Sequence, residues 1–127
     1  MAVTSKKKRI KKTLTEGVVH IQASYNNTIV SIAEENGDIL TWASAGASGF
    51  KGSRKSTPYA AQVAAEKAIE KAKAFGLEKA MIRVKGIGPG REQAIRGVYG
   101  AGVDITGIVD VTPVAHNGCR QARVRRV

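Results

Sequence analysis

Hydrophobic and polar residues alternate along residues 17–24, and this period of two is typical of a β-strand with one buried face. Val19, Ile21 and Ala23 fall on the predicted buried face. His20 falls on the opposite face, so it is expected to be a sheet-surface histidine rather than a ligand. The apolar pattern of the chain therefore begins with a half-buried strand.

Two further strands are predicted directly after the first. Residues 28–33 are rich in β-branched side chains, and residues 39–44 follow an Asn36-Gly37 pair, a strong signal of a hairpin turn. Together with the first strand they form a predicted antiparallel meander. Trp42 is expected to pack as a core or sheet-face anchor rather than to serve as a base-stacking platform, since isolated aromatic residues usually pack.

A long helix is predicted over residues 58–75. Thr57 is a good N-cap, Pro58 suits the first helical position, and Gly76 is the expected C-cap. The opposite side of the helix from the sheet mixes glutamate and lysine and is expected to face solvent. Small residues recur at helical spacing and predict a face that lies close to a sheet: Ala61, Ala65, Ala68, Ala72 and Phe75.

The remaining elements complete an α/β pattern. A strand is predicted over residues 77–84, a short helix around residues 94–99, and a last strand from residue 102 to about residue 111. Right-handed crossovers then give a single domain with a mixed five-stranded sheet and two main helices. The expected strand order is 3-2-1-4-5, with strand 2 antiparallel to its neighbours.

The two ends of the chain differ in composition from its middle. Residues 1–12 and 116–127 carry ten of the 21 lysines and arginines and no acid, within a formal net charge of +11. We therefore assign residues 13–115 to the α/β domain, and the two ends to a disordered basic arm and a basic C-terminal tail. Cations that cannot pack in a core are typical of a protein that neutralises a polyanion, nucleic acid before membrane.

The sequence contains no signal of a membrane or secreted protein. No apolar run approaches the roughly 20 residues of a membrane span, and no apolar signal segment follows the charged N-terminus. Cys119 is the only cysteine, so an internal disulfide is excluded and a reducing, cytoplasmic compartment is expected. We expect neither membrane association nor a homo-oligomer.

Two glycine-rich loops are candidate phosphate-binding sites. The first covers residues 46–58 and the second residues 86–91, and each combines several glycines with nearby cations at the start of a predicted helix. Glycine brings backbone N–H groups close to a partner, and a helix N-terminus attracts anions. Both loops follow the ends of strands that can share one rim of the sheet. The alternative is a solvated loop with ordinary surface lysines.

The candidate RNA contacts follow from this distribution of charge and from the polar turns. Asparagine and histidine side chains in turns suit the sugars and splayed bases of folded RNA, and turn formation alone explains them equally well. The full set contains the cations of the arm, loops and tail and four turn residues: Lys6, Lys7, Lys8, Arg9, Lys11, Lys12, Asn26, Asn27, Lys51, Arg54, Lys55, Lys85, Arg91, Arg96, His116, Asn117, Arg120, Arg123, Arg125 and Arg126.

The sequence offers little for catalysis. His116 and Cys119 have the spacing of half a zinc site, but no second pair of ligands exists, and no nucleophile has a matching base and acid. The strand order also occurs in ribonuclease H-like nucleases, whose two metals need converging carboxylates, whereas Asp104 and Asp110 form no obvious cluster. We expect no enzyme, metal or cofactor, with Mg²⁺ only as a counterion of bound RNA. The alternatives are a general nucleic-acid-compacting protein and, less favoured, such a nuclease.

Four stretches of the chain resemble one protein family. They are residues 23–30 (ASYNNTIV), 48–62 (SGFKGSRKSTPYAAQ), 85–91 (KGIGPGR) and 110–120 (DVTPVAHNGCR). Together they resemble the bacterial form of the eleventh protein of the small ribosomal subunit, and the likeness spans nearly the whole chain from Gly17 onward.

This resemblance implies a ribonuclease H-like fold without catalysis. It also implies a place on the platform of the small subunit, in contact with its rRNA near the messenger RNA path and the exit site. The neighbours that it implies are the paired sixth and eighteenth proteins of the subunit, with the seventh across the exit channel. A structural constituent of the ribosome, which helps assembly and translation, is therefore the expected function.

Overall fold

The computed structural model describes residues 15–126, and the predicted arm, residues 1–12, lies outside them. Neither α-helix within the described residues is long and apolar enough to cross a membrane. In chain order the described elements are β1 (Glu16–Ala23), β2 (Thr28–Ala33), β3 (Ile39–Ser44), a short 3₁₀ helix η1 (Gly52–Ser56), α1 (Pro58–Lys73), β4 (Lys79–Lys85), α2 (Arg91–Gly100) and β5 (Asp104–Asp110).

The strands form a mixed sheet in the predicted order β3-β2-β1-β4-β5. β2 pairs antiparallel with both β1 and β3, whereas β4 pairs parallel with β1 and β5. Short turns suffice for the antiparallel pairs, and the parallel pairs need the two helical crossovers. The predicted α/β fold class and strand order are confirmed, and β1, β3, β4 and β5 all run in one direction.

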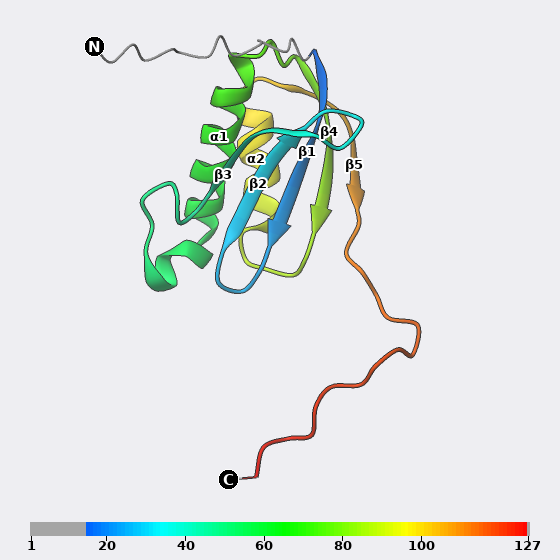
Figure 1. Ribbon diagram of the computed structural model, residues 1–127. Coiled ribbons are helices and arrows are strands. Elements are labelled where there is room, and N and C mark those ends of the chain that lie inside the picture. The colour runs from blue at the N-terminus through cyan, green and yellow to red at the C-terminus, as the bar shows by residue number, and fades with distance from the viewer. Residues whose placement is uncertain (1–14, 127) are drawn as a thin grey trace, which may run out of the picture.

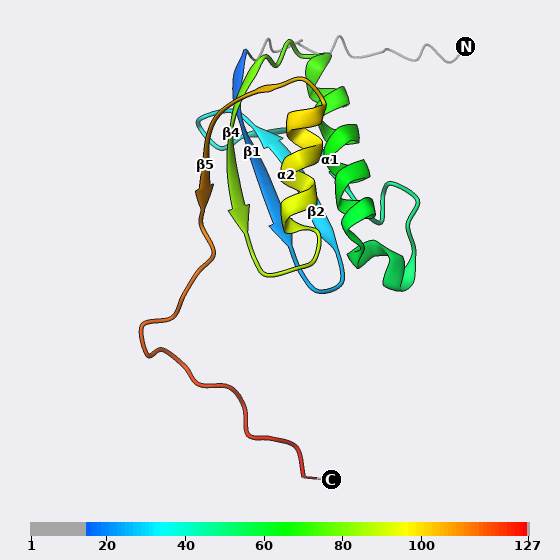
Figure 2. The same ribbon diagram turned by 180° about the vertical axis from the view of Figure 1, so that it is seen from behind.

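Both helices cover the same face of the sheet, so the molecule has two layers. Figure 1 shows α1 and α2 behind the strands, and the reverse view in Figure 2 shows them in front. α1 packs against β2 and β3, and α2 packs against β1 and alongside α1. The other face of the sheet, which we call the open face, has no helix over it within residues 15–126.

The core lies between the helices and the sheet, where small helical side chains meet large strand side chains. Ile21, Ile32 and Ile82 are the largest fully buried strand residues. Because alanine ends at Cβ, α1 lies close to the strands and the isoleucines fill the layer. The predicted small-residue face of the helix is confirmed, and its buried residues are Ala60, Ala61, Ala64, Ala65, Ala68, Ile69 and Ala72.

The two ends of α1 follow from its capping residues. At the start, Thr57 Oγ1 accepts a hydrogen bond from the N–H of Ala60 at 3.2 Å, as expected of an N-cap. At the other end the chain tightens after Lys73, and Gly76 adopts a φ of +89°. The helix therefore ends before Phe75, slightly earlier than predicted, because the turn that leads to Gly76 is already non-helical.

Two strands are shorter than predicted. β4 begins at Lys79 rather than at Leu77, because the N–H of Leu77 still donates to the carbonyl of Ala72 in the turn after α1. β5 begins at Asp104 rather than at Gly102, which has a φ of +89° in the turn before the strand. Val111 follows the last strand residue, and its N–H still donates a hydrogen bond to β4.

Trp42 and His20 both lie on the open face. Thr41 and Ala43 take the buried positions of β3, so the alternation of the strand turns Trp42 away from the helices. Its side chain is 55% exposed, so the sheet-face alternative is confirmed and a core position is wrong. His20 is half-buried on the same face, as predicted for a sheet-surface histidine, and lies beside Arg83 in the parallel register.

Candidate nucleic-acid interface

Four segments of the chain meet at one end of the strands of the sheet. We call this end of the sheet the loop edge. Because β1, β3, β4 and β5 run in one direction, their carboxyl ends all lie there (Figure 1). The prediction that the two glycine loops share one rim is confirmed. The loop edge consists of the β1–β2 turn (24–27), the β3–α1 loop (45–57), the β4–α2 loop (86–90) and the segment after β5 (111–116).

The β3–α1 loop is closed by its own hydrogen bonds. The carbonyl of Ser44 accepts from both the N–H and the hydroxyl of Ser48, at 3.0 and 2.8 Å, and the carbonyl of Ala45 accepts from the N–H of Phe50. Lys67 of α1 donates to the carbonyl of Ser48 at 3.4 Å. Backbone N–H groups that donate within the loop are not available to a phosphate. Hydrogen bonds therefore hold the first half of the loop, residues 45–50, in place.

The three cations of this loop are available for an anion. Lys51 precedes η1, and Arg54 and Lys55 occupy its last turn. Lys51 and Arg54 are exposed, Lys55 is half-buried, and within residues 15–126 none of them pairs with an acid. Phe50 packs edge-to-face on Tyr59 of α1, with ring centroids 5.8 Å apart, and this contact fixes the loop against the first turn of the helix.

The glycines of the β4–α2 loop serve close packing. A Cβ atom on Gly86 would lie 2.1 Å from the carbonyl oxygen of Ala23, at the end of β1. A Cβ atom on Gly90 would lie 2.5 Å from Thr28 Oγ1 and 2.6 Å from the Cβ of Ala61. The loop therefore lies directly against β2 and α1, and side chains at these positions do not fit. Close packing against neighbouring backbone and side chains therefore accounts for the glycines at these two positions.

Arg91, a predicted phosphate contact, is engaged within the protein. Its guanidinium donates to the carbonyl of Gly86 at 3.1 Å and forms an ion pair with the carboxylate of Asp110. Thr112 donates to the same carboxylate from its N–H and its hydroxyl, at 3.0 and 2.6 Å. The hydrogen bonds from Thr112, followed by that from Arg91, hold the pKa of Asp110 well below its usual range. Arg91 therefore braces α2 against the end of β5.

The other two cations near the second loop differ in position. Lys85 is exposed at the end of β4 and lies beside Gln22 in the register of the open face. Arg96 is exposed in the middle of α2, about 7.5 Å along the helix axis from Arg91 at the usual helical rise. The structure brings Lys85 to the loop edge and leaves Arg96 behind it.

The two candidate asparagines of the β1–β2 turn have different tasks. The N–H of Asn27 donates to Ser24 Oγ at 3.1 Å, and its side-chain carbonyl accepts from the N–H of Thr28 at 2.9 Å. Asn26 is exposed, and its side chain forms no hydrogen bond with another described residue. Asn27 therefore holds the turn, and Asn26 is available to a partner.

The candidates beyond β5 lie on an extended C-terminal segment, which Figure 1 shows leading away from the sheet below the loop edge. Asn117 has a φ of +56°, a turn conformation that asparagine tolerates. In the described part of the chain, no three side chains of His, Cys, Asp or Glu cluster as metal ligands would. The arm candidates from Lys6 to Lys12 lie outside the described residues. The tail candidates are all exposed: His116, Asn117, Arg120, Arg123, Arg125 and Arg126.

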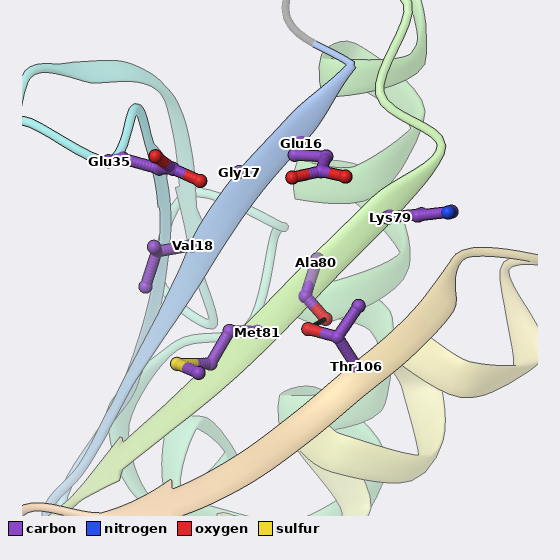
Figure 3. A pocket seen from close by; sticks show the side chains of 8 residues that line it. All are labelled: Glu16, Gly17, Val18, Glu35, Lys79, Ala80, Met81 and Thr106. Carbon is purple, nitrogen blue, oxygen red and sulfur yellow. Dashed lines mark hydrogen bonds between the residues drawn. The ribbon is translucent and has the colours of Figure 1, made fainter.

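Acidic residues gather at the opposite edge of the sheet. A hollow of about 280 Å³ lies on the open face there, and Figure 3 shows the carboxylates of Glu16 and Glu35 in its lining, above Val18 and Met81. Lys79 also lines this hollow, but two carboxylates against one ammonium leave it net negative, so it does not suit the phosphates of RNA. Six of the ten acids of the chain lie at the amino ends of β1, β4 and β5 or in the β2–β3 hairpin: Glu16, Glu34, Glu35, Asp38, Glu78 and Asp104.

The carboxylates of β5 are placed unfavourably for a nuclease. Asp104 begins the strand and Asp110 ends it, so they lie at opposite edges of the sheet, about 20 Å apart at the usual rise of a strand. Asp110 is in addition paired with Arg91. A two-metal mechanism needs carboxylates that converge, and this pair does not.

Two residues near the loop edge escaped the sequence predictions. Tyr25, at the tip of the β1–β2 turn, is 73% exposed, and an aromatic residue inside a tight polar turn is the signal that was available. Arg83 is exposed on the open face, where the alternation of β4 places it with Lys85.

The pKa of His20 is lowered by partial burial and secondly by the charge of Arg83, so His20 is neutral at pH 7.

Comparison with known proteins bears on the whole described domain. The family described as ribosomal protein S11 matches residues 17–126. The small ribosomal subunit protein uS11 of Cellvibrio japonicus is 58% identical over 124 residues, which cover 98% of this chain and 95% of the relative. The uS11 proteins of Teredinibacter turnerae and Marinobacter nauticus are each 56% identical, again over 98% of this chain and over 95% and 96% of their own lengths.

The matched range includes both glycine loops, the β1–β2 turn and most of the basic tail. A match that begins in the first strand, with more than half of the residues identical in each of these relatives, shows that this chain belongs to the ribosomal protein S11 family.

Proposed function

We propose that this chain is a structural constituent of the small ribosomal subunit that binds rRNA through its loop edge and its basic tails. The separation of charge within the domain carries the proposal. Lys51, Arg54, Lys55 and Lys85 lie at the loop edge without an acid partner in the described residues, whereas six of the ten acids lie at the opposite edge. The loop edge therefore presents the cations that a phosphate backbone prefers, and the acids of the opposite edge disfavour binding there.

The mode of binding follows from the geometry of that edge. The cations sit on segments that the core and the hydrogen bonds described above hold in place, so they meet phosphates at fixed positions without reading sequence. Family membership supports the platform of the subunit as the location, near the messenger RNA path and the exit site. It also supports the sixth, eighteenth and seventh proteins as neighbours, and assembly and translation in the bacterial cytoplasm as the setting.

A competition assay tests this function on the purified full chain. A platform fragment of small-subunit rRNA is expected to outcompete random duplex DNA by orders of magnitude at near-physiological salt. If about eight phosphates are engaged, the logarithm of the affinity should fall against the logarithm of the salt concentration with a slope of about −6 to −7. Equal competition by duplex DNA would support the general nucleic-acid-compacting protein instead.

A charge-matched pair of variants tests the loop edge. Replacing Lys51, Arg54 and Lys55 by glutamine is expected to weaken rRNA binding and to reduce the salt slope by about 2 to 3. The control replaces Lys71 and Lys73 of α1 and Lys79 of β4 by glutamine, which removes the same charge away from the loop edge. Thermal unfolding of both variants checks that they fold. Equal losses in the two variants would show that net charge, and not the loop edge, governs binding.

A further inference from the structure

A second hollow, of about 350 Å³, lies where the open face meets the loop edge. This volume is at the low end of the roughly 300–1,000 Å³ of small-ligand pockets. Three segments distant in sequence form it, namely the end of β1 with its turn, the start of the β4–α2 loop and the chain after β5. We call it the Tyr25 hollow, after the aromatic residue among the lining residues Gln22, Ala23, Ser24, Tyr25, Lys85, Gly86, Ile87, Thr112 and Pro113.

The walls of the Tyr25 hollow are fixed by hydrogen bonds and close packing. The N–H of Gly86 donates to Thr112 Oγ1 at 3.1 Å, which joins the second wall to the third. Gly86 also lies so close to Ala23 that a Cβ atom would not fit. In the first wall, the N–H and the hydroxyl of Ser24 both donate to the carbonyl of Asn27, at 2.8 and 3.1 Å. A partner therefore meets a preformed site and loses little free energy in ordering it.

Two apolar side chains of this site are left in water. Tyr25 is 73% exposed and Ile87 is 67% exposed, although both belong to segments that the core holds in place. Pro113, also exposed, adds a rigid ring to the lining. Exposed apolar groups that gather around one hollow mark a binding site more often than singly scattered ones do.

The polar groups of the hollow select the kind of partner. Lys85 is the only charged residue in the lining, and no acid lines it. The nearby Asp110 is already paired with Arg91 and bonded by Thr112. Gln22, next to Lys85 in the register, presents an exposed amide that can both donate and accept.

We propose that the Tyr25 hollow holds one unpaired base of the bound RNA, an inference that rests on the proposed function. The ring of Tyr25 stacks on the base, Gln22 hydrogen-bonds to its edge, and Lys85 meets the adjoining phosphate. Sequence-specific proteins bind RNA mainly in this way, through unstacked bases placed on aromatic side chains. An aromatic ring, an amide and a single cation around a small hollow match one nucleotide.

Tyr25 and Tyr99 form a matched pair for the test, because each tyrosine is 73% exposed and Tyr99 lies on α2, outside the hollow. The full chain and its Tyr25→Ala, Tyr25→Phe and Tyr99→Ala variants are titrated with a small-subunit rRNA transcript at several salt concentrations. Loss of one stacked base is expected to weaken binding by Tyr25→Ala about 5- to 150-fold. Tyr25→Phe keeps the ring and should bind nearly as the wild type does, and so should Tyr99→Ala.

The salt dependence separates stacking from charge. Tyr25→Ala is expected to leave the salt slope unchanged, whereas Lys85→Ala should reduce it by about 1. Wild-type affinity in Tyr25→Ala, an equal loss in Tyr99→Ala, or equal losses in the alanine and phenylalanine variants of Tyr25 would each overturn the base site. Failure of the proposed function is a different result, since the wild-type chain itself would then not bind the transcript.

Discussion

Arg91, the first residue of α2, forms an ion pair with Asp110, the last residue of β5, and so ties a helix start to a strand end across the loop edge. The same guanidinium donates to the carbonyl of Gly86, so that the loop before the helix is part of the brace. Arg91, which the sequence suggests as a phosphate contact, thus holds α2, β5 and the loop between β4 and α2 together.

The ion pair between Arg91 and Asp110 makes the stability of the fold depend on pH in the acid range. Because the pKa of Asp110 is lowered in the folded protein, its contribution to stability is complete above the ordinary value of 3.8 and is lost as the pH falls further. Asp110→Asn is expected to lower the melting temperature at pH 7, and the difference from the wild type should shrink below pH 4. Circular dichroism melts from pH 7 to pH 2.5 measure this, and a difference that stays constant over that range would contradict it.

His20 makes the stability of the fold depend on pH a second time, nearer to neutral pH. Its pKa is lowered in the folded state by burial and then by Arg83, so the unfolded chain binds the proton more readily. Stability is therefore expected to be complete above pH 6.5 and to decrease as the pH falls toward the lowered pKa. His20→Gln should remove this slope, and Arg83→Gln should make it shallower. Urea midpoints at pH 8 and pH 5.5 give the comparison, and identical slopes in all three proteins would refute the assignment.

The contact between α1 and α2 depends on the lack of a side chain at Gly97. A Cβ atom there would lie 2.9 Å from the carbonyl oxygen of Gln62 and 3.0 Å from the Cβ of Ala65. Gly97→Ala is expected to lower the free energy of unfolding by about 1–3 kcal/mol, the usual effect of overpacking. Gly100→Ala, at the end of the same helix with nothing within 4 Å, should be neutral or gain up to about 1 kcal/mol. Urea unfolding compares the two, and equal effects would argue against the close contact.

Thr28 carries a hydroxyl that the fold does not use. Its Oγ1 is buried and has no hydrogen-bond partner within the described residues, and the same holds for Thr41. Thr28→Val is expected to stabilise the protein by about 1 kcal/mol, because an unsatisfied buried polar group is replaced by a methyl group. Thr106 donates to the carbonyl of Ala80 at 3.3 Å, so Thr106→Val should bring no such gain. Chemical denaturation that shows a loss for Thr28→Val would disprove the reading.

The elements that the sequence predicts well are those with local causes. The alternation of Val19, Ile21 and Ala23 specifies β1, and Thr57 with Pro58 specifies the start of α1. Strand order followed because short turns and helical crossovers leave few alternatives. These features require no knowledge of distant contacts.

The contacts of the loop edge depend on partners far away in the sequence. The sequence shows that residue 86, a glycine, has no side chain. It does not show that the carbonyl of Ala23 fills the space where a side chain of Gly86 would lie. Likewise, nothing local to Arg91 reveals that Asp110 neutralises it. Trp42 lies on an edge strand of a sheet covered on one side only, and that layering is a property of the whole fold. Which cations remain available is therefore decided by tertiary structure.

The alanines that line α1 set the thickness of the molecule. The helix runs from the loop edge toward the opposite end, so its distance from the strands fixes the height at which Lys51 and Arg54 are carried. A bulkier residue at Ala64 or Ala68 would lift the helix and shift these cations relative to the second loop. The spacing of charges across this surface therefore depends on buried methyl groups of the helix.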